Sequence, residues 1–413
     1  MATLKKNIGY LAVVQVSNIF LPFLTVPYLT RTLAPEGYGS VAYVLAIIAM
    51  LGILTDFGFS LFATKEVAGA FGNHFRINGI IGSVLAIKAG LFLISGIITV
   101  VFATWTSDHR TATLATIVLI SLFGQTFQLD WLFQGLERMK SLAVATLMSK
   151  LLFVFLVIVT VKTSADSVNV LWANAASSCL TMGIELAIML GMGYRPRFSD
   201  LVMIKKVFVS SFGYFLSRLA VSTYTAGSTL FLGQFSTSTQ TGLYSIADQI
   251  YKALQGLLSP IAQALYPNTI QTNNVSLVIR IAKLMAAVCL FGLVVHLMFG
   301  ELIIVKLFGE KFSEAKNIIS LLLVVLAFNS PSVLMGYPLL GAIGRASDVN
   351  RSVIFGAIFH LLILSCLYLL GLFDAIYVAG SVLAVELTVL LVRVWIYRNH
   401  VSRALLLEKA RVR

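Results

Sequence analysis

The sequence predicts an all-α polytopic membrane protein with about twelve transmembrane helices, arranged as two six-helix lobes around a central cationic cavity. Of its 413 residues, 58% are hydrophobic and 11% are charged, and the mean hydropathy is +0.92. Soluble domains carry roughly 25% charged residues. Apolar stretches recur along the chain, and the connections between them alternate in Lys and Arg content. Because the apolar stretches require lipid, the net charge of +13 is interpreted by its position along the chain and not as a sign of a nucleic-acid partner.

Each predicted span is mainly apolar and has about 20 residues or more, the length that crosses a bilayer. The first follows Lys5 and Lys6 and lacks the short apolar region and cleavage site of a signal peptide, so we expect it to remain as a membrane helix. The spans are residues 8–30, 38–62, 79–103, 111–134, 141–161, 168–190, 207–233, 242–268, 281–299, 315–342, 348–370 and 375–397.

The Lys and Arg residues predict the orientation of these spans. With the N-terminus inside, 19 of the 30 fall in inner segments, six in outer connections and five within spans. Inner connections of membrane proteins are enriched in Lys and Arg. We therefore expect a multi-pass protein of the bacterial inner membrane with both termini in the cytoplasm.

Two short motifs recur about half a chain apart. Gly9-Tyr10 returns as Gly213-Tyr214, and the string GYGSVA at 37–42 returns as GLYSIA at 242–247. A unit of six spans enters twice from the same side, which gives parallel repeats. We expect an N-terminal lobe over 1–197, a C-terminal lobe over 198–413, and a basic connection over 191–206.

The span 207–233 carries a polar stripe with an arginine at its centre. At 100° per residue, its members lie within about 40° of one direction. The stripe comprises Ser211, Tyr214, Arg218, Ser222, Thr225 and Thr229. Hydroxyl groups that pack helices together would explain the Ser and Thr residues. The wall of a water-filled cavity would also explain Arg218.

Other ionisable residues within spans are costly in lipid and normally face a cavity or a partner. Lys88 has Ser95 and Thr99 on its own face, and it contributes charge to a cavity or pairs with a carboxylate such as Asp56. Asp248 and Lys252 have the i,i+4 spacing of an intrahelical pair.

Further charged residues lie near the ends of spans. Arg31 ends the first span, where it can line the cavity or reach outer headgroups. Asp56, Asp130 and Glu185 lie towards inner ends, where burial costs less. Ion coupling is one role for the first two of these and for Asp248.

No catalytic, metal or cofactor motif was found in the sequence. It lacks the phosphate-binding G-x-x-x-x-G-K-[ST] string, G-x-S-x-G and H-E-x-x-H. The outer connections are short, which argues against an extramembrane catalytic domain. We expect neither an enzyme nor a cofactor.

Several strings resemble the polysaccharide transporter family of bacterial flippases, and in particular its O-antigen (Wzx-type) branch. They are LTRTLAPEGYG at 29–39, DFG at 56–58, ATKE at 63–66, DWLFQGLERM at 130–139, GLYSIA at 242–247 and YP at 266–267. The similarity runs over most of the chain and is densest before Lys140. The family is related to multidrug and toxin extruders and to the peptidoglycan lipid flippases, which have fourteen spans.

The resemblance implies transport of an undecaprenyl-diphosphate-linked oligosaccharide from the cytoplasmic to the periplasmic leaflet. The implied partners are this lipid-linked substrate, membrane lipids, an O-antigen polymerase and a chain-length regulator. Cationic side chains can neutralise a diphosphate, and hydroxyl groups can line a path for sugars. The candidate substrate-binding residues are Arg218, Lys88, Arg31, Lys252, Ser222 and Thr225, and the ion-coupling candidates are Asp248, Asp56 and Asp130.

Two other functions stay open at this point. A drug or cation extruder on the same scaffold would be expected to place unpaired carboxylates in its cavity. A membrane polymerase or glycosyltransferase would need larger loops than this chain offers.

Overall fold

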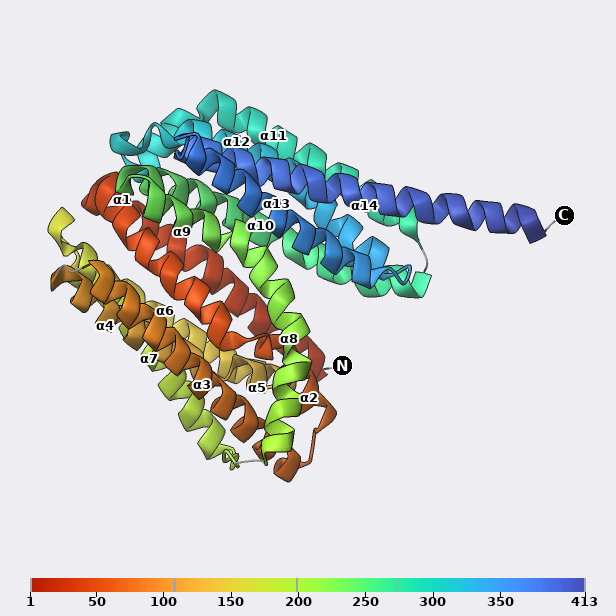
Figure 1. Ribbon diagram of the computed structural model, residues 1–413, viewed down its shortest axis with the longest axis horizontal. Helices are drawn as coiled ribbons and strands as arrows, with labels where there is room; N and C mark the ends of the chain where they lie inside the picture. The colour runs from red at the N-terminus through yellow and green to blue at the C-terminus, as the bar shows by residue number, and fades with distance from the viewer. Residues whose placement is uncertain (1, 107–108, 198–199, 273, 412–413) are drawn as a thin grey trace. The chain divides into compact units, whose positions relative to one another are not determined.

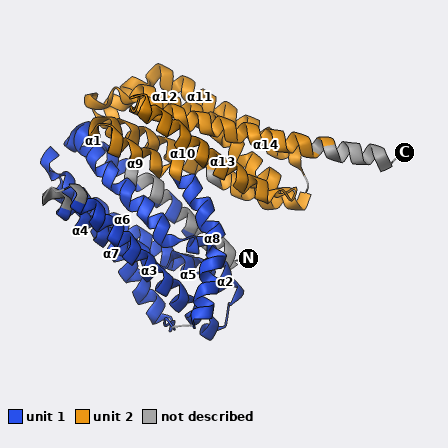
Figure 2. Ribbon diagram, in the orientation of Figure 1, with its two compact units in different colours: residues 1–222 blue, residues 223–413 orange. Residues whose placement is uncertain are grey.

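The computed structural model describes residues 2–106, 109–197, 200–272 and 274–411, and over these residues the chain is helical and contains no strand (Figure 1). The prediction of an all-α protein is confirmed. The chain divides into two compact units, residues 1–222 and 223–413 (Figure 2). The lobe boundary at 197/198, which was inferred from the repeat of six spans, stays a prediction.

Unit 1 contains eight α-helices and one short 3-10 turn. They are α1 (Ala2–Asp56), α2 (Phe59–Gly69), α3 (His74–Thr106), α4 (His109–Thr126), α5 (Asp130–Gly135), α6 (Met139–Thr160), η1 (Ser164–Asp166), α7 (Ser167–Gly191) and α8 (Leu201–Tyr224), whose last two residues belong to unit 2.

Unit 2 contains six further α-helices. They are α9 (Ala226–Phe235), α10 (Ser238–Thr272), α11 (Val275–Phe308), α12 (Ala315–Leu334), α13 (Ala346–Leu369) and α14 (Ala375–Arg411). A 3-10 turn, η2 (Glu310–Phe312), precedes α12, and a π-helical segment, η3 (Met335–Gly341), follows it.

Nine stretches of the described residues are long and apolar enough to cross a membrane. The predicted spans 8–30 and 38–62 contribute one such stretch, Phe23–Gly69, while 207–233 and 242–268 contribute none because α8, α9 and α10 are shorter or more polar. The chain is therefore polytopic, and the exact number of twelve spans stays a prediction. Side chains such as Phe291 and Met298 on α11 are more than two-thirds exposed, as expected for a helix that faces lipid.

Four of the predicted spans are interrupted helices. Span 38–62 breaks between α1 and α2, 111–134 between α4 and α5, 207–233 at Thr225, and 315–342 at the π-helical segment. Backbone groups freed by such breaks must find partners because lipid offers none. The polar stripe of span 207–233 is consequently not continuous: Thr225 has non-helical torsion angles (φ −104°, ψ −81°), and the 100° rule fails beyond it.

The core of unit 1 forms where α2, α3, α5 and α8 meet. Trp131, Phe133 and Phe59 are almost fully buried there. The ring of Phe57 stacks on Phe208 and on Phe215 of α8, with centroid distances of 4.5 and 4.7 Å. These contacts fix α8 against the break between α1 and α2.

Gly58 makes that approach possible. Its φ of +77° is a left-handed conformation that glycine adopts readily. A Cβ at this position would lie 2.7 Å from the backbone nitrogen of Phe215 and 2.7 Å from Cβ of Tyr214. A glycine is therefore required for both the turn and the packing of α8.

Candidate functional site

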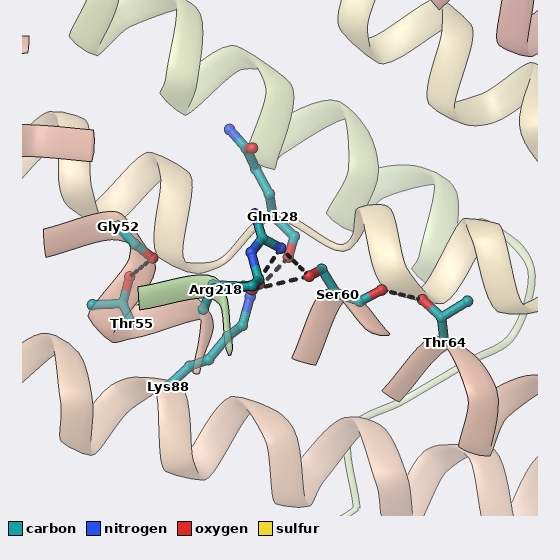
Figure 3. Close-up of polar contacts among 8 residues, drawn as sticks. Gly52, Thr55, Ser60, Thr64, Lys88, Gln128 and Arg218 are labelled. Atoms are coloured by element: carbon teal, nitrogen blue, oxygen red, sulfur yellow. Dashed lines mark hydrogen bonds and ion pairs between the residues drawn. The ribbon is translucent and has the colours of Figure 1, made fainter. Parts of the chain in front are cut away.

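The break between α1 and α2 places three polar side chains in contact (Figure 3). Nη1 of Arg218 on α8 donates to Oδ2 of Asp56, the last residue of α1, at 3.2 Å, and it also donates to Oγ of Ser60 on α2. Oγ of Ser60 donates in turn to Asp56 Oδ2 at 3.0 Å. The Arg218 side chain is 45% exposed and that of Asp56 is 24% exposed, so this pair is reachable from solvent.

The break between α4 and α5 supplies backbone groups to two buried charges. Nζ of Lys88 on α3 donates to the carbonyl of Gln128 at 3.5 Å (Figure 3). The amide of Leu129 donates to Oε2 of Glu185 on α7 at 2.5 Å. Residues 127–129 are non-helical, which leaves these backbone groups without helical partners and lets the two side chains satisfy them.

These groups form one network, which we call the charge cluster: Lys88, Arg218, Asp56, Asp130 and Glu185. Lys88 is 3% exposed and interacts electrostatically with Asp56, Asp130 and Glu185. Asp130, the first residue of α5, lies within side-chain hydrogen-bonding range of Glu185, which is 0% exposed. Five helices of unit 1 thus meet at charged side chains.

The structure therefore brings together four predicted site residues, Arg218, Lys88, Asp56 and Asp130. Lys88 was expected either to contribute charge to a cavity or to pair with a carboxylate, and its carboxylate surroundings match the second interpretation. The ion pair that Asp56 forms within 4 Å among the described residues is nevertheless with Arg218. The functional roles of these residues stay predictions.

The remaining predicted residues lie elsewhere. Nζ of Lys252 donates to Oδ2 of Asp248 at 2.5 Å within α10 of unit 2, which forms the intrahelical pair that the spacing allows. Arg31 is exposed on α1, and Ser222 and Thr225 are half-buried at the end of α8 and just after it.

Unit 2 has a second buried polar group, built around Arg393, one of the five cationic residues that the sequence places within spans. Arg393 on α14 donates from Nη1 to the carbonyl of Ser332 at 2.7 Å and to its Oγ at 3.1 Å, and from Nε to Oγ of Ser352 at 3.1 Å. Glu386 and Asn329 are buried beside it. The run Asn329-Ser330-Pro331-Ser332 inside an apolar span was the signal that could have indicated this cluster.

Among the described residues, no group of three His, Cys, Asp or Glu side chains is placed to hold a metal ion. His360 instead lies between the Oγ atoms of Ser228 and Ser381, each 3.3 Å from a ring nitrogen. This geometry fits a hydrogen-bonded packing histidine.

Solved structures of membrane exporters share this fold. One is described as the inward-facing conformation of a multidrug resistance MATE family transporter of the MOP superfamily. It aligns with a TM-score of 0.70 at 13% identity, covering 98% of this chain and 99% of that one. Another is the lipid II flippase MurJ in an inward closed conformation, with a TM-score of 0.71 at 12% identity, covering 94% and 87%. The fold is that of a multi-pass membrane transporter.

The sequence comparisons name the family. Residues 4–273 match the polysaccharide biosynthesis protein family. A protein of Escherichia coli (strain K12) named "Putative O-antigen transporter" is 30% identical over 406 residues, which cover 96% of this chain and 97% of the relative. A protein of Shigella dysenteriae with the same name is 27% identical over 367 residues, covering 87% and 91%. The chain belongs to the polysaccharide biosynthesis protein family, as the resemblance indicated.

Proposed function

We propose that this protein is a flippase that moves undecaprenyl-diphosphate-linked O-antigen units from the cytoplasmic to the periplasmic leaflet of the inner membrane by alternating access. The names of the relatives and the flippase-like fold support transport of a lipid-linked saccharide. The proposed substrate rests on one observation: Arg218 is half-exposed and lies in a helix that the sequence places in the membrane.

Arg218 is suited to a diphosphate because its guanidinium presents several N–H groups in a rigid plane. Its hydrogen bonds to Asp56 and Ser60 both come from Nη1. The exposed remainder of the group can therefore bind a phosphate oxygen while Asp56 and Ser60 hold the side chain in place. Lys88 is buried in this conformation, so its charge acts through Asp56 and the first substrate contact is assigned to Arg218.

Deleting the gene tests the proposal. Lipid-linked O-units should accumulate on the cytoplasmic leaflet, and a plasmid copy should restore O-antigen to the cell surface. Unchanged surface O-antigen in the deletion strain would contradict the proposal.

A cation extruder is the second candidate, and one observation favours it: the charge cluster contains three carboxylates and two cations. Glu185 is fully buried, however, so a bulky organic cation cannot reach it in this conformation. Export of a fluorescent organic cation from cells that express the protein, with unchanged surface O-antigen, would select this candidate. For a membrane polymerase or glycosyltransferase no comparable observation exists.

A further inference from the structure

Glu185 is a buried carboxylate with one unsatisfied oxygen. Its Oε2 accepts from the amide of Leu129, while Oε1 is buried and has no hydrogen-bond partner among the described residues. Leaving a buried charged acceptor without a donor costs about 1–3 kcal/mol or more. Oε1 of Glu185 therefore lacks a hydrogen-bond donor.

The neighbouring carboxyl group of Asp130 increases the need for a hydrogen-bond donor at Glu185. Its carboxyl group lies within hydrogen-bonding range of the Glu185 carboxyl group, yet two ionised carboxylates contain only acceptors and repel each other. A single proton between them converts the repulsion into a hydrogen bond.

The net charge of the charge cluster also indicates one bound proton. Asp56, Asp130 and Glu185 contribute three negative charges, and Lys88 and Arg218 contribute two positive charges. One bound proton makes the cluster neutral, which a medium of low dielectric constant strongly favours.

We propose that Asp130 and Glu185 bind one proton between them beside Lys88, and that this site binds and releases the proton during the transport cycle. The second half of this statement rests on the proposed function. Asp130 is half-buried while Glu185 is fully buried, so the proton enters and leaves through Asp130. The ammonium group of Lys88 already supplies a cation beside these carboxylates, which favours a proton over a metal cation.

The neighbouring charges explain how occupancy could be transmitted. Asp130 from α5 and Lys88 from α3 act on Glu185, and Asp56 from α1 acts on Lys88 in turn. Loss of the proton leaves one excess negative charge that attracts Lys88 more strongly. Asp56 then loses part of its interaction with Lys88, and its pairing with Arg218 strengthens.

Infrared spectroscopy of the full-length protein in lipid vesicles, without substrate, tests the proton site. The wild type at neutral pH should show the C=O band of a protonated carboxyl group. Glu185→Gln and Asp130→Asn should each remove the same band, and Asp130→Asn provides the test if Glu185→Gln fails to fold. Asp248→Asn is the matched control and should leave the band unchanged, because Asp248 is paired with Lys252.

A band that survives both substitutions overturns the proposal. A band lost only in Glu185→Gln overturns the shared proton, and one that Na⁺ removes from the wild type indicates a metal cation instead. Lys88→Gln supplies a check of opposite sign: it leaves three carboxylates facing one cation, so a second protonated band should appear, and an unchanged spectrum would contradict the charge balance.

The coupling to transport is measured separately, as flipping in vesicles with an imposed pH gradient. The wild type should respond to the gradient, whereas Glu185→Gln, whose amide supplies the missing hydrogen permanently, should flip without responding. An equal response in the two proteins overturns the coupling. A wild type that shows the band and flips nothing would overturn the proposed function and leave the proton site intact.

Discussion

At the scale of single residues, Arg218 is held by hydrogen bonds to Asp56 and Ser60, while its side chain stays 45% exposed. A partly exposed ion pair contributes about 1 kcal/mol or less to stability. Removing the side chain should therefore leave the protein folded and inserted. This separation between a small structural role and a large proposed functional role makes Arg218 the most informative position to change.

Arg218→Ala should lower O-antigen on the cell surface by about tenfold, the effect of losing about 1.4 kcal/mol of substrate interaction, at unchanged protein level in the membrane. Arg218→Lys should be milder because it keeps the charge but not the planar group. Lys88→Ala should also reduce export, because three carboxylates then lack their buried cation. Surface O-antigen and membrane protein level are both measured by immunoblot. Wild-type export by both Ala variants would refute the predicted role of these cations.

Gly58→Ala should destabilise unit 1 by roughly 1–3 kcal/mol, because a Cβ meets the backbone of α8 and the residue has a positive φ. Thermal unfolding of the purified protein in detergent measures the change. Gly69→Ala is the matched control, since a Cβ there meets nothing within 4 Å. Equal unfolding temperatures for the two variants would show that α8 does not pack on the turn as described.

The charged residues within spans were predictable one by one, but their grouping was not. Arg218 and Lys88 are conspicuous because charge in an apolar span is costly. Their partners depend on two backbone breaks, at 57–58 and 127–129, where positive φ values and non-helical residues redirect the chain. Hydropathy averages over such breaks, so it locates a span and cannot indicate which backbone groups the span leaves free.

At the scale of helices, the same limitation explains why the predicted ends differ from the observed ones. The span 281–299 is only the lipid-like part of α11, which runs from Val275 to Phe308. Hydrogen bonding continues a helix into polar sequence until a residue such as Gly309, with φ of +97°, ends it. A proline inside a span does not by itself mark a helix end, because α10 continues through Pro260 and Pro267.

Arg393 is a buried polar link between three helices of unit 2. It ties α14 to α12 and α13 through Ser332 and Ser352, just before the π-helical segment. Arg393→Ala should lower the free energy of unfolding by about 3–5 kcal/mol, because it removes three hydrogen bonds of a buried charged group and the positive charge that acts on buried Glu386.

Thermal unfolding in detergent compares Arg393→Ala with Arg398→Ala, which removes an exposed arginine from the same helix and should change stability by about 0.5 kcal/mol or less. If Arg393→Ala unfolds at the temperature of Arg398→Ala, the buried link does not stabilise unit 2.

At the scale of the whole molecule, the charge pattern of the connections predicts the topology. The basic connection 191–206 and both termini should face the cytoplasm, and 233–241 and 370–375 should face the periplasm. Single cysteines placed in these connections can be tested with a reagent that does not cross the membrane. Labelling of 191–206 from outside would overturn the model of two parallel six-helix lobes.

The remaining question for the whole molecule is what drives export without an ATP-binding motif. One elementary charge is worth about 2.3 kcal/mol per 100 mV, so a dianionic headgroup leaving a negative interior gains up to about 4.6 kcal/mol per 100 mV. With one proton bound the charge cluster is neutral, so the empty carrier has no net charge there and the potential acts on the step that moves the headgroup. We therefore expect an inside-negative potential to drive the cycle.

We therefore expect flipping in proteoliposomes to accelerate when an inside-negative potential is imposed and to slow when an ionophore collapses it. A pH gradient should add a second dependence. If the carboxylate beside Lys252 carries the proton, Asp248→Asn should reduce the dependence on the pH gradient. If the charge cluster carries the proton, Glu185→Gln should reduce it instead. The two variants therefore show which of the two units binds the proton. If flipping proceeds at the same rate with and without the potential and the pH gradient, consumption of the product in the periplasm remains as the driving force. That result would also remove Asp248 from the mechanism.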